Sequence, residues 1–181
     1  PGAVDFSGLQ MRVKRSEVTG GGTLSTKGLL TADLGFRDVN PALLPWWKPP
    51  QGTPPGDLDG RVRVTARRIA PRPDATLALT LSPGRIGRLA IQRGSIRLVA
   101  HPDGGAVFDS SWIQMPGGVL SVRGRLGSNR SLDATVNGRI DDLTRLNPLL
   151  GGMPAESGTG RVRGRIIGTV DDPRCVAQGD L

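Results

Sequence analysis

The chain has 181 residues, of which 27 are Gly and 15 are Pro, and only 36% are apolar. Because Gly and Pro both disfavour helix interiors, this composition excludes a protein built mainly of long helices. The 24 Lys and Arg residues exceed the 16 Asp and Glu residues, which gives a net charge of +8, but the cations are spread along the chain without a basic block or interleaved aromatic residues. We therefore expect no nucleic-acid partner.

Cysteine and histidine usage limits the chemistry of the chain. Cys175 is the single cysteine and His101 the single histidine, so neither an internal disulfide nor a Cys/His zinc site can form. We expect no metal and no cofactor. The sequence holds no run of about 18 consecutive apolar residues and no signal peptide. Because it begins at Pro1 without Met and ends at Leu181 in mid-pattern, we expect a segment of a longer polypeptide, with any membrane anchor elsewhere.

Two short pieces of the chain have a helical pattern. Residues 38–44 and 141–147 are the only candidates, and Pro41 and Pro148 limit each to a turn or two. The first piece leads into a Pro- and Gly-rich loop that contains Trp46 and Trp47. This Trp pair suits either a membrane interface or the end of an apolar core.

Alternation of apolar and polar residues dominates the rest of the chain. In residues 60–67, Val62, Val64 and Ala66 share one face and the arginines share the other, which is typical of a half-buried strand. The same pattern returns in residues 77–81, 96–99, 120–126 and 132–140. Turn signals such as Ser-Pro-Gly at residues 82–84 and Arg-Gly at residues 93–94 separate these runs. Their short spacing predicts an all-β protein with an antiparallel meander of strands in sequence order.

The sequence also repeats itself. Gly-Arg-Val-Arg at residues 60–63 recurs at residues 160–163, and residues 38–44 are similar to residues 142–150. In both copies the first piece is followed by a Pro/Gly-rich loop and then by the Gly-Arg-Val-Arg strand. The two copies of this strand start 100 positions apart, so one unit is about 100 residues long. We predict a partial preceding β repeat in residues 1–37, a full repeat in residues 38–140, and the truncated start of the next repeat in residues 141–181.

These motifs resemble a known family. Asn-Pro-Ala-Leu-Leu at residues 40–44 and the segments at residues 55–64, 115–124 and 160–170 are similar to repeats of the TamB and AsmA-like proteins, of the translocation and assembly module. The resemblance covers roughly residues 30–181. It implies an elongated antiparallel sheet curled into a U-shaped, taco-like trough with an apolar inside.

The resemblance also implies a location and partners. Such proteins are anchored in the inner membrane and cross the periplasm, and they are associated with phospholipid transport to the outer membrane, outer-membrane biogenesis and protein secretion. The expected partners are phospholipid acyl chains and an outer-membrane β-barrel protein. Membrane contact is expected through parts outside this segment.

The alternation itself predicts an apolar face that no amphipathic helix of the chain could cover. Either bound lipid or a second layer of a closed core must then lie against it. The residues that we expect to line a lipid-binding groove are Val62, Val64, Leu77, Leu79, Leu81, Ile91, Ile96, Leu98, Leu120, Val122, Leu126, Leu132, Val136, Ile140, Val162 and Ile166. The arginines on the opposite face favour solubility and edge protection, whereas Arg88 and Arg93 could meet lipid phosphates at a rim.

No constellation of catalytic residues emerges from the sequence. The acidic pairs at residues 141–142 and 171–172 sit at turns, where Asp serves caps and Asx turns. His101 precedes a hairpin tip, and the nearby serines lack a nucleophile-elbow pattern. We therefore expect a non-enzymatic lipid conduit. The alternatives are a scaffold that pairs its strand edges with outer-membrane client proteins, and a structural β repeat without cargo.

Overall fold

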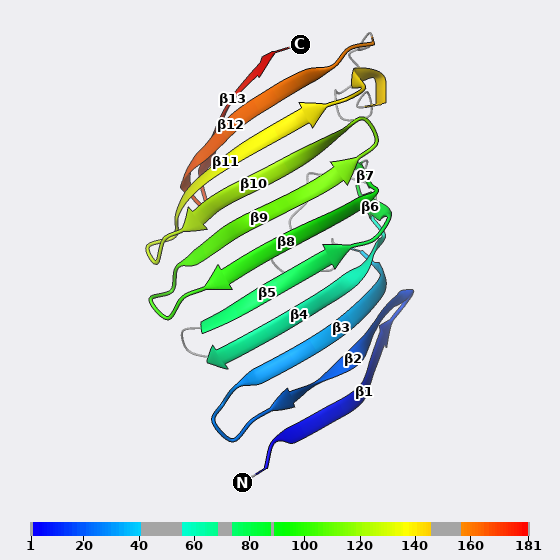
Figure 1. Ribbon diagram of the computed structural model, residues 1–181, viewed down its shortest axis with the longest axis vertical. Coiled ribbons are helices and arrows are strands. Elements are labelled where there is room, and N and C mark those ends of the chain that lie inside the picture. Colours follow the sequence, from blue (N-terminus) through cyan, green and yellow to red (C-terminus); the bar gives the residue numbers. More distant parts are fainter. Residues whose placement is uncertain (1, 41–55, 69–73, 88, 146–156, 181) are drawn as a thin grey trace.

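The computed structural model describes residues 2–40, 56–68, 74–87, 89–145 and 157–180. Eleven strands form one antiparallel sheet in the order β1-β2-β3-β4-β5-β8-β9-β10-β11-β12-β13 (Figure 1). The sheet is not closed into a barrel. Its strands are β1 (Val4–Val13), β2 (Ser16–Leu24), β3 (Leu30–Val39), β4 (Leu58–Arg68), β5 (Asp74–Leu81), β8 (Arg93–Ala100), β9 (Ala106–Met115), β10 (Gly118–Leu126), β11 (Ser131–Ile140), β12 (Gly160–Thr169) and β13 (Pro173–Asp180).

A small hairpin interrupts the meander between β5 and β8. It consists of β6 (Gly84–Ile86) and β7 (Leu89–Ile91), which form a separate two-stranded sheet. Backbone hydrogen bonds in both directions between Asp57 and Arg85 attach the hairpin to the start of β4. Ile91 is 3% exposed and forms a small core with Leu58 and Leu81. The hairpin therefore covers one end of the neighbouring strands.

The predicted meander is confirmed, with two local corrections. The predicted turn at Arg93-Gly94 is wrong, because both residues begin β8 and the turn lies earlier, in the β6–β7 excursion. The predicted helical piece at 38–44 begins inside β3, which continues to Val39, and its remainder lies outside the described residues. The second piece forms one 3-10 turn at residues 143–145. No α-helix occurs in the described ranges.

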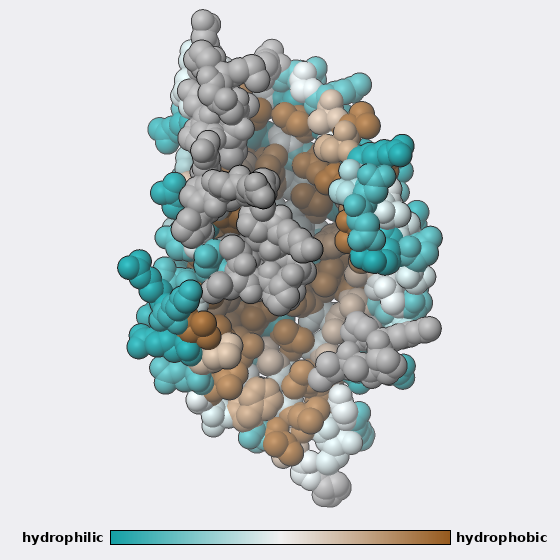
Figure 2. Space-filling model, turned by 180° about the vertical axis from the view of Figure 1, so that it is seen from behind, coloured by the Kyte–Doolittle hydropathy of each residue, from teal (hydrophilic) through white to brown (hydrophobic). Residues whose placement is uncertain are grey.

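The register gives the sheet one apolar face. Directly paired residues of neighbouring strands point to the same side, so the pairs from β1 to β13 define a continuous surface. We call this surface the apolar face. Its large members include Phe6, Met11, Val18, Leu34, Phe36, Leu58, Val62, Val64, Leu77, Leu79, Leu81, Ile96, Leu98, Phe108, Ile113, Leu120, Val122, Leu126, Leu132, Val136, Ile140, Val162 and Ile166. In Figure 2, hydrophobic side chains gather along the middle of this side, between hydrophilic margins.

Glycines lie beside large side chains on the apolar face. Gly60 of β4 pairs with Phe36 on one side and with Leu81 on the other. A Cβ built at Gly60 would lie 2.2 Å from the Thr80 carbonyl oxygen and 2.7 Å from the Phe36 ring. At this point the neighbouring strand and the ring occupy the space of a side chain. Only Gly permits such close packing.

The two ends of the sheet are strand edges. Among the described residues β1 pairs only with β2, and β13 pairs only with β12. Every residue of β13 is exposed. The sheet also runs without a break through both predicted repeat boundaries, and the boundary after residue 37 falls inside β3. The two Gly-Arg-Val-Arg segments lie in β4 and β12, where Gly60 pairs with Phe36 and Gly160 pairs with Ile140.

Candidate functional site

The apolar face is the candidate site, and it contains all but one of the predicted groove residues. The exception is Ile91, which belongs to β7 and packs onto the face from the small hairpin. Period-two alternation did not reveal this, because the apolar run around Ile91 could not be assigned to a separate hairpin from the sequence. The other fifteen predicted residues share the face because their strands pair in register.

The predicted groove residues differ in how far they are covered. Leu81 and Ile91 are each 3% exposed. The remaining fourteen are half-buried. In a closed sandwich or barrel, most such side chains would be covered by a second layer, as core residues are in compact domains. In the described part of the chain, the small hairpin of β6 and β7 covers the face around Leu58 and Leu81. The neighbouring face residues Phe36, Leu79, Ile96 and Ile113 pack against the same cluster.

Neighbouring side chains form rows that cross the strands. One row joins Val64, Leu77, Leu98 and Phe108 through direct pairs of β4, β5, β8 and β9. A parallel row joins Ala66, Ala75, Ala100 and Ala106 at the ends of the same strands. A molecule that lay along these rows would meet one apolar strip running perpendicular to the strands.

Several large residues of the face escaped the sequence analysis. Phe108, Ile113 and Met115 lie on β9, a strand that the alternation did not reveal. The register of β9 shifts against both β8 and β10 near Ser110, whose φ is 51°. A bulge of this kind moves the residues after it to the other parity, so one continuous period-two pattern cannot fit the strand. Separate alternation on each side of Ser110 was the available signal.

One buried polar residue lies on the apolar face. Ser111 is 6% exposed and follows the bulge. Its hydroxyl accepts a hydrogen bond from the Arg97 backbone N–H at 3.2 Å and lies 3.5 Å from the Arg97 carbonyl oxygen. The hydroxyl therefore satisfies backbone groups that the bulge leaves out of the ladder, which is a structural role.

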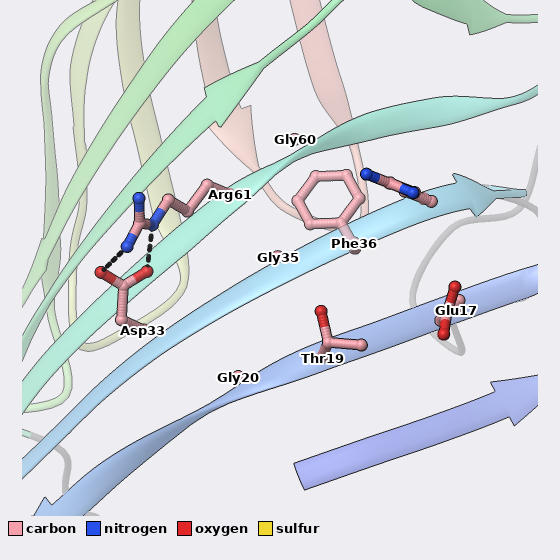
Figure 3. A pocket seen from close by; sticks show the side chains of 9 residues that line it. Glu17, Thr19, Gly20, Asp33, Gly35, Phe36, Gly60 and Arg61 are labelled. Atoms are coloured by element: carbon pink, nitrogen blue, oxygen red, sulfur yellow. Dashed lines mark hydrogen bonds and ion pairs between the residues drawn. The ribbon is translucent and has the colours of Figure 1, made fainter. Parts of the chain in front are cut away.

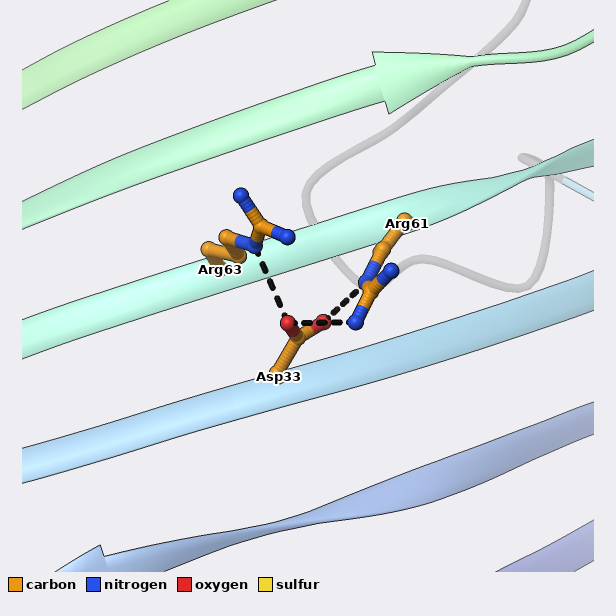
Figure 4. Close-up of polar contacts among 3 residues, drawn as sticks. All are labelled: Asp33, Arg61 and Arg63. Atoms are coloured by element: carbon orange, nitrogen blue, oxygen red, sulfur yellow. Dashed lines mark hydrogen bonds and ion pairs between the residues drawn. The ribbon is translucent and has the colours of Figure 1, made fainter.

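The opposite face is polar and carries cross-strand ion pairs. Asp33 of β3 accepts hydrogen bonds from Arg61 Nη2 at 2.7 Å and from Arg63 Nε at 2.9 Å (Figure 4). The hydrogen bond from Arg61, followed by that from Arg63, lowers the pKa of Asp33 despite partial desolvation. The pKa of Arg61 is raised by the same contact. One carboxylate therefore pairs with two cations, which leaves this cluster with one net positive charge.

A similar pair lies further along the polar face. Asp133 of β11 accepts hydrogen bonds from Arg165 Nε at 3.0 Å and Nη2 at 3.1 Å. These bonds lower the pKa of Asp133, and the charge of Arg125 lowers it further. All of these groups are exposed or nearly so, so each pair adds little to stability.

A depression on the polar side lies over β2, β3 and β4 (Figure 3). Glu17 and Asp33 are the carboxylates that line it, together with Arg37 and Arg61. Asp33 is held by arginines, and Glu17 accepts a hydrogen bond from Gln10 Nε2 at 2.8 Å. Both carboxylates of this depression therefore already have partners within the sheet, and among its described lining residues no nucleophile lies beside a base.

The remaining candidates from the sequence lie at turns, in strands or outside the described residues. Asp142 accepts hydrogen bonds from the Thr144 side chain at 2.6 Å and backbone at 3.1 Å, which with Arg145 lower its pKa. His101 is exposed at the start of the turn between β8 and β9. Cys175 is exposed on β13.

The two predicted rim cations and the Trp pair have different outcomes. Arg93 lies on the polar face, because its neighbour Gly94 occupies the apolar one, and its guanidinium stacks 5.8 Å from the Trp112 ring centroid. It therefore does not line the apolar face. Arg88, Trp46 and Trp47 lie outside the described residues.

The described residues contain neither a candidate metal site nor a candidate membrane-spanning helix. Within the described ranges, no cluster of three or more potential metal ligands occurs, and no helix has the length and hydropathy of a membrane span. No protein-family model matches the chain, and comparison with curated proteins and with solved structures finds no match.

Proposed function

We propose that the apolar face binds phospholipid acyl chains and that the chain acts as a segment of a lipid conduit. The observation that carries this proposal is the continuity of the face across eleven strands, with fourteen of its predicted residues left half-buried. Exposed apolar surface of this extent marks a site of interaction. An extended row of side chains suits an extended apolar ligand better than a small compact one.

Moving acyl chains through water costs free energy, and the apolar face would reduce this cost. Transfer of a two-chain lipid with roughly thirty methylenes from a bilayer into water costs about 24 kcal/mol of free energy, at about 0.8 kcal/mol per methylene. An apolar strip would replace one apolar environment by another, so that the chains never meet water in full. The protein would lower a transfer barrier without making or breaking bonds, and it is not an enzyme in this proposal.

The curvature of the sheet belongs to the same proposal. A sheet that curls lengthwise into a U-shaped trough would surround an acyl chain on three sides. Two features support such bending: the close approach of the β5 backbone to Gly60, and the packing of Leu120 against Gly138, whose Cβ position lies 2.8 Å from Leu120 Cδ2. Repeats of about 100 residues would extend the trough by adding strands at its edges.

The resemblance to TamB and AsmA-like repeats supplies the proposed setting. In that setting the segment lies in the periplasm of a protein anchored in the inner membrane, and phospholipid moves toward the outer membrane. An outer-membrane β-barrel protein would be the partner at the far end. The charge distribution agrees with a solvated outer face, because the ion pairs of Asp33 and Asp133 lie on the side opposite the apolar face.

Photo-cross-linking tests the proposal directly. Probes at Val64 and Val122 of the apolar face should label acyl chains, whereas probes at Arg63 and Arg123 of the polar face should not. Equal labelling of both sets would contradict the assigned role of the apolar face. Labelling of neither set, in a chain with a native far-UV spectrum, would favour a cargo-free structural repeat.

Charge substitutions provide a second test. Replacing Leu79, Leu98, Leu120 and Val136 by Asp places carboxylates in the acyl path, where an unpaired charge is costly. Lipid cross-linking and lipid transfer between vesicles should be lost. The matched control replaces Thr80, Arg97, Ser121 and Asn137, their neighbours on the polar face, by Asp. Normal transfer by the first variant would refute the conduit.

A second function is favoured by the sheet edges. β13 is exposed along its whole length and is unpaired on one side among the described residues, so another strand could add to it. A scaffold for outer-membrane proteins would use this edge and not the apolar face. Gln178→Pro should then abolish client binding while lipid transfer persists, and the opposite result would favour the conduit.

A further inference from the structure

A group of exposed arginines without ion-pair partners lies on β10 and β12, on the polar face. We call Arg123 and Arg125 of β10, with Arg161 and Arg163 of β12, the arginine patch. All four are exposed, and within the described residues none forms an ion pair, in contrast to Arg61, Arg63, Arg139 and Arg165 on the same face. The patch therefore presents four positive charges that no carboxylate holds in an ion pair.

The register gathers the patch on one area of the sheet. β10 and β12 both pair with β11, so they are two strand spacings apart, about 10 Å. Between them β11 presents uncharged Thr135 and Asn137, with Asp133 opposite Arg125 and Arg139 opposite Arg161. Successive members on one strand are two residues apart, about 7 Å. The four guanidinium groups thus project from one side of three adjacent strands.

Acidic groups on this part of the face do not neutralise the patch. Asp133 accepts two hydrogen bonds from Arg165. Arg125 forms no hydrogen bond with Asp133 and lowers its pKa only through its charge. Asp180 pairs in register with Arg161 but makes no ion pair with it within 4 Å. Arg161 also faces Arg139 directly across the β11–β12 ladder. Like charges in this position repel each other, and a bound anion would relieve the repulsion.

Exposed apolar side chains flank the patch on the same face. Ile167 is 39% exposed and pairs with Asp133, and Val176 is 63% exposed and pairs with Arg165. A basic surface with interspersed apolar side chains is the composition that binds the interface of an anionic bilayer. No aromatic residue occurs on the outward side of β10–β13 to stack on nucleic-acid bases.

We infer that the arginine patch docks the chain onto an anionic phospholipid membrane surface. Guanidinium groups pair with phosphate oxygens in bidentate fashion, and an array of them on a sheet matches a plane of headgroups better than it matches one small anion. The inference is independent of the lipid conduit, because the patch lies on the opposite face from the acyl-chain site.

The test measures binding of the 181-residue chain to vesicles by co-sedimentation. Vesicles of equal parts phosphatidylcholine and phosphatidylglycerol should bind the protein, and vesicles of phosphatidylcholine alone should bind it weakly. Each basic residue near an anionic surface changes partitioning about fivefold. The double variant Arg123→Gln/Arg163→Gln should therefore bind the anionic vesicles roughly 25-fold more weakly.

The sheet offers a matched control for net charge. Arg61→Gln/Arg63→Gln removes the same two charges from the same face, but these arginines are already paired with Asp33. Its binding should change less than about threefold from that of the unmodified chain. Equal weakening by both double variants would overturn the inference, because the attraction would then follow net charge alone.

Two further measurements complete the test. Arg123→Lys/Arg163→Lys keeps the charge and should retain binding within a few-fold, so loss in the Gln variant alone excludes misfolding as its cause. Binding should also fall steeply with added salt. Failure of the unmodified chain to bind anionic vesicles would refute the inference, as would displacement from them by a duplex DNA at equal phosphate concentration.

Discussion

Replacing Gly60 of β4 by Ala tests the close packing of β5 and Phe36 against Gly60. The added Cβ would lie 2.2 Å from the Thr80 carbonyl oxygen and 2.7 Å from Cζ of Phe36. The ring can rotate away, but the carbonyl belongs to the ladder between β4 and β5 and can move only with its strand. The two strands must therefore separate or the local bend must open.

The expected cost follows from two opposed effects. Gly→Ala at a tolerant position stabilises a protein by about 0.4–1 kcal/mol through the unfolded chain. Overpacking costs about 1–3 kcal/mol, and contact with backbone places this site near the upper end. We expect a net loss of about 2 kcal/mol. For a chain of this length, that corresponds to a fall of roughly 4–8 °C in Tm.

A matched control lies on the neighbouring strand. A Cβ at Gly35 of β3 would have its nearest contact at 3.7 Å, with Thr19 Oγ1, which is an ordinary van der Waals distance. Gly35→Ala should therefore leave stability unchanged or raise it slightly. Urea titration followed by far-UV circular dichroism gives both free energies of unfolding. Equal stability of the two variants would refute the close approach of β5 to Gly60.

Three further predictions concern burial, pH and secondary structure. Leu81→Ala should lower the free energy of unfolding, measured by urea titration, by about 2–4 kcal/mol, because Leu81 is 3% exposed. Leu132→Ala should lower it by about half as much, because Leu132 is half-buried. Equal losses would contradict the uneven cover of the apolar face. Arg61 lowers the pKa of Asp33 in the folded state, so this group stabilises the fold above about pH 4 and the contribution is lost as pH falls through the folded pKa. The thermal stabilities of the unmodified chain and Asp33→Asn should therefore converge below pH 4, and a constant difference would contradict the ion pair. Far-UV circular dichroism should show mainly strand, and a helix content above roughly a third, the average of globular proteins, would contradict the all-β fold.

Local sequence patterns predict the class of the fold and the two faces of most strands. Period two is a local property of an extended backbone, so Val62 and Arg63 must point to opposite sides whatever their strand pairs with. Turn residues act over two to four positions, which is why the turn signal at residues 82–84 falls where β5 ends and β6 begins. Both signals require no knowledge of distant contacts.

The contacts of each face depend on the tertiary structure and could not be predicted from the sequence. The bulge at Ser110, the departure of β6 and β7 from the sheet, and the burial of Ile91 depend on contacts between residues that are distant in sequence. The same holds for charge: the sequence shows arginines at every second position in two similar segments, but only strand pairing gives Arg63 a partner in Asp33 and leaves Arg163 without one. Register acts between strands, and alternation acts within one, so the sequence pattern could predict the faces but not the arginine patch.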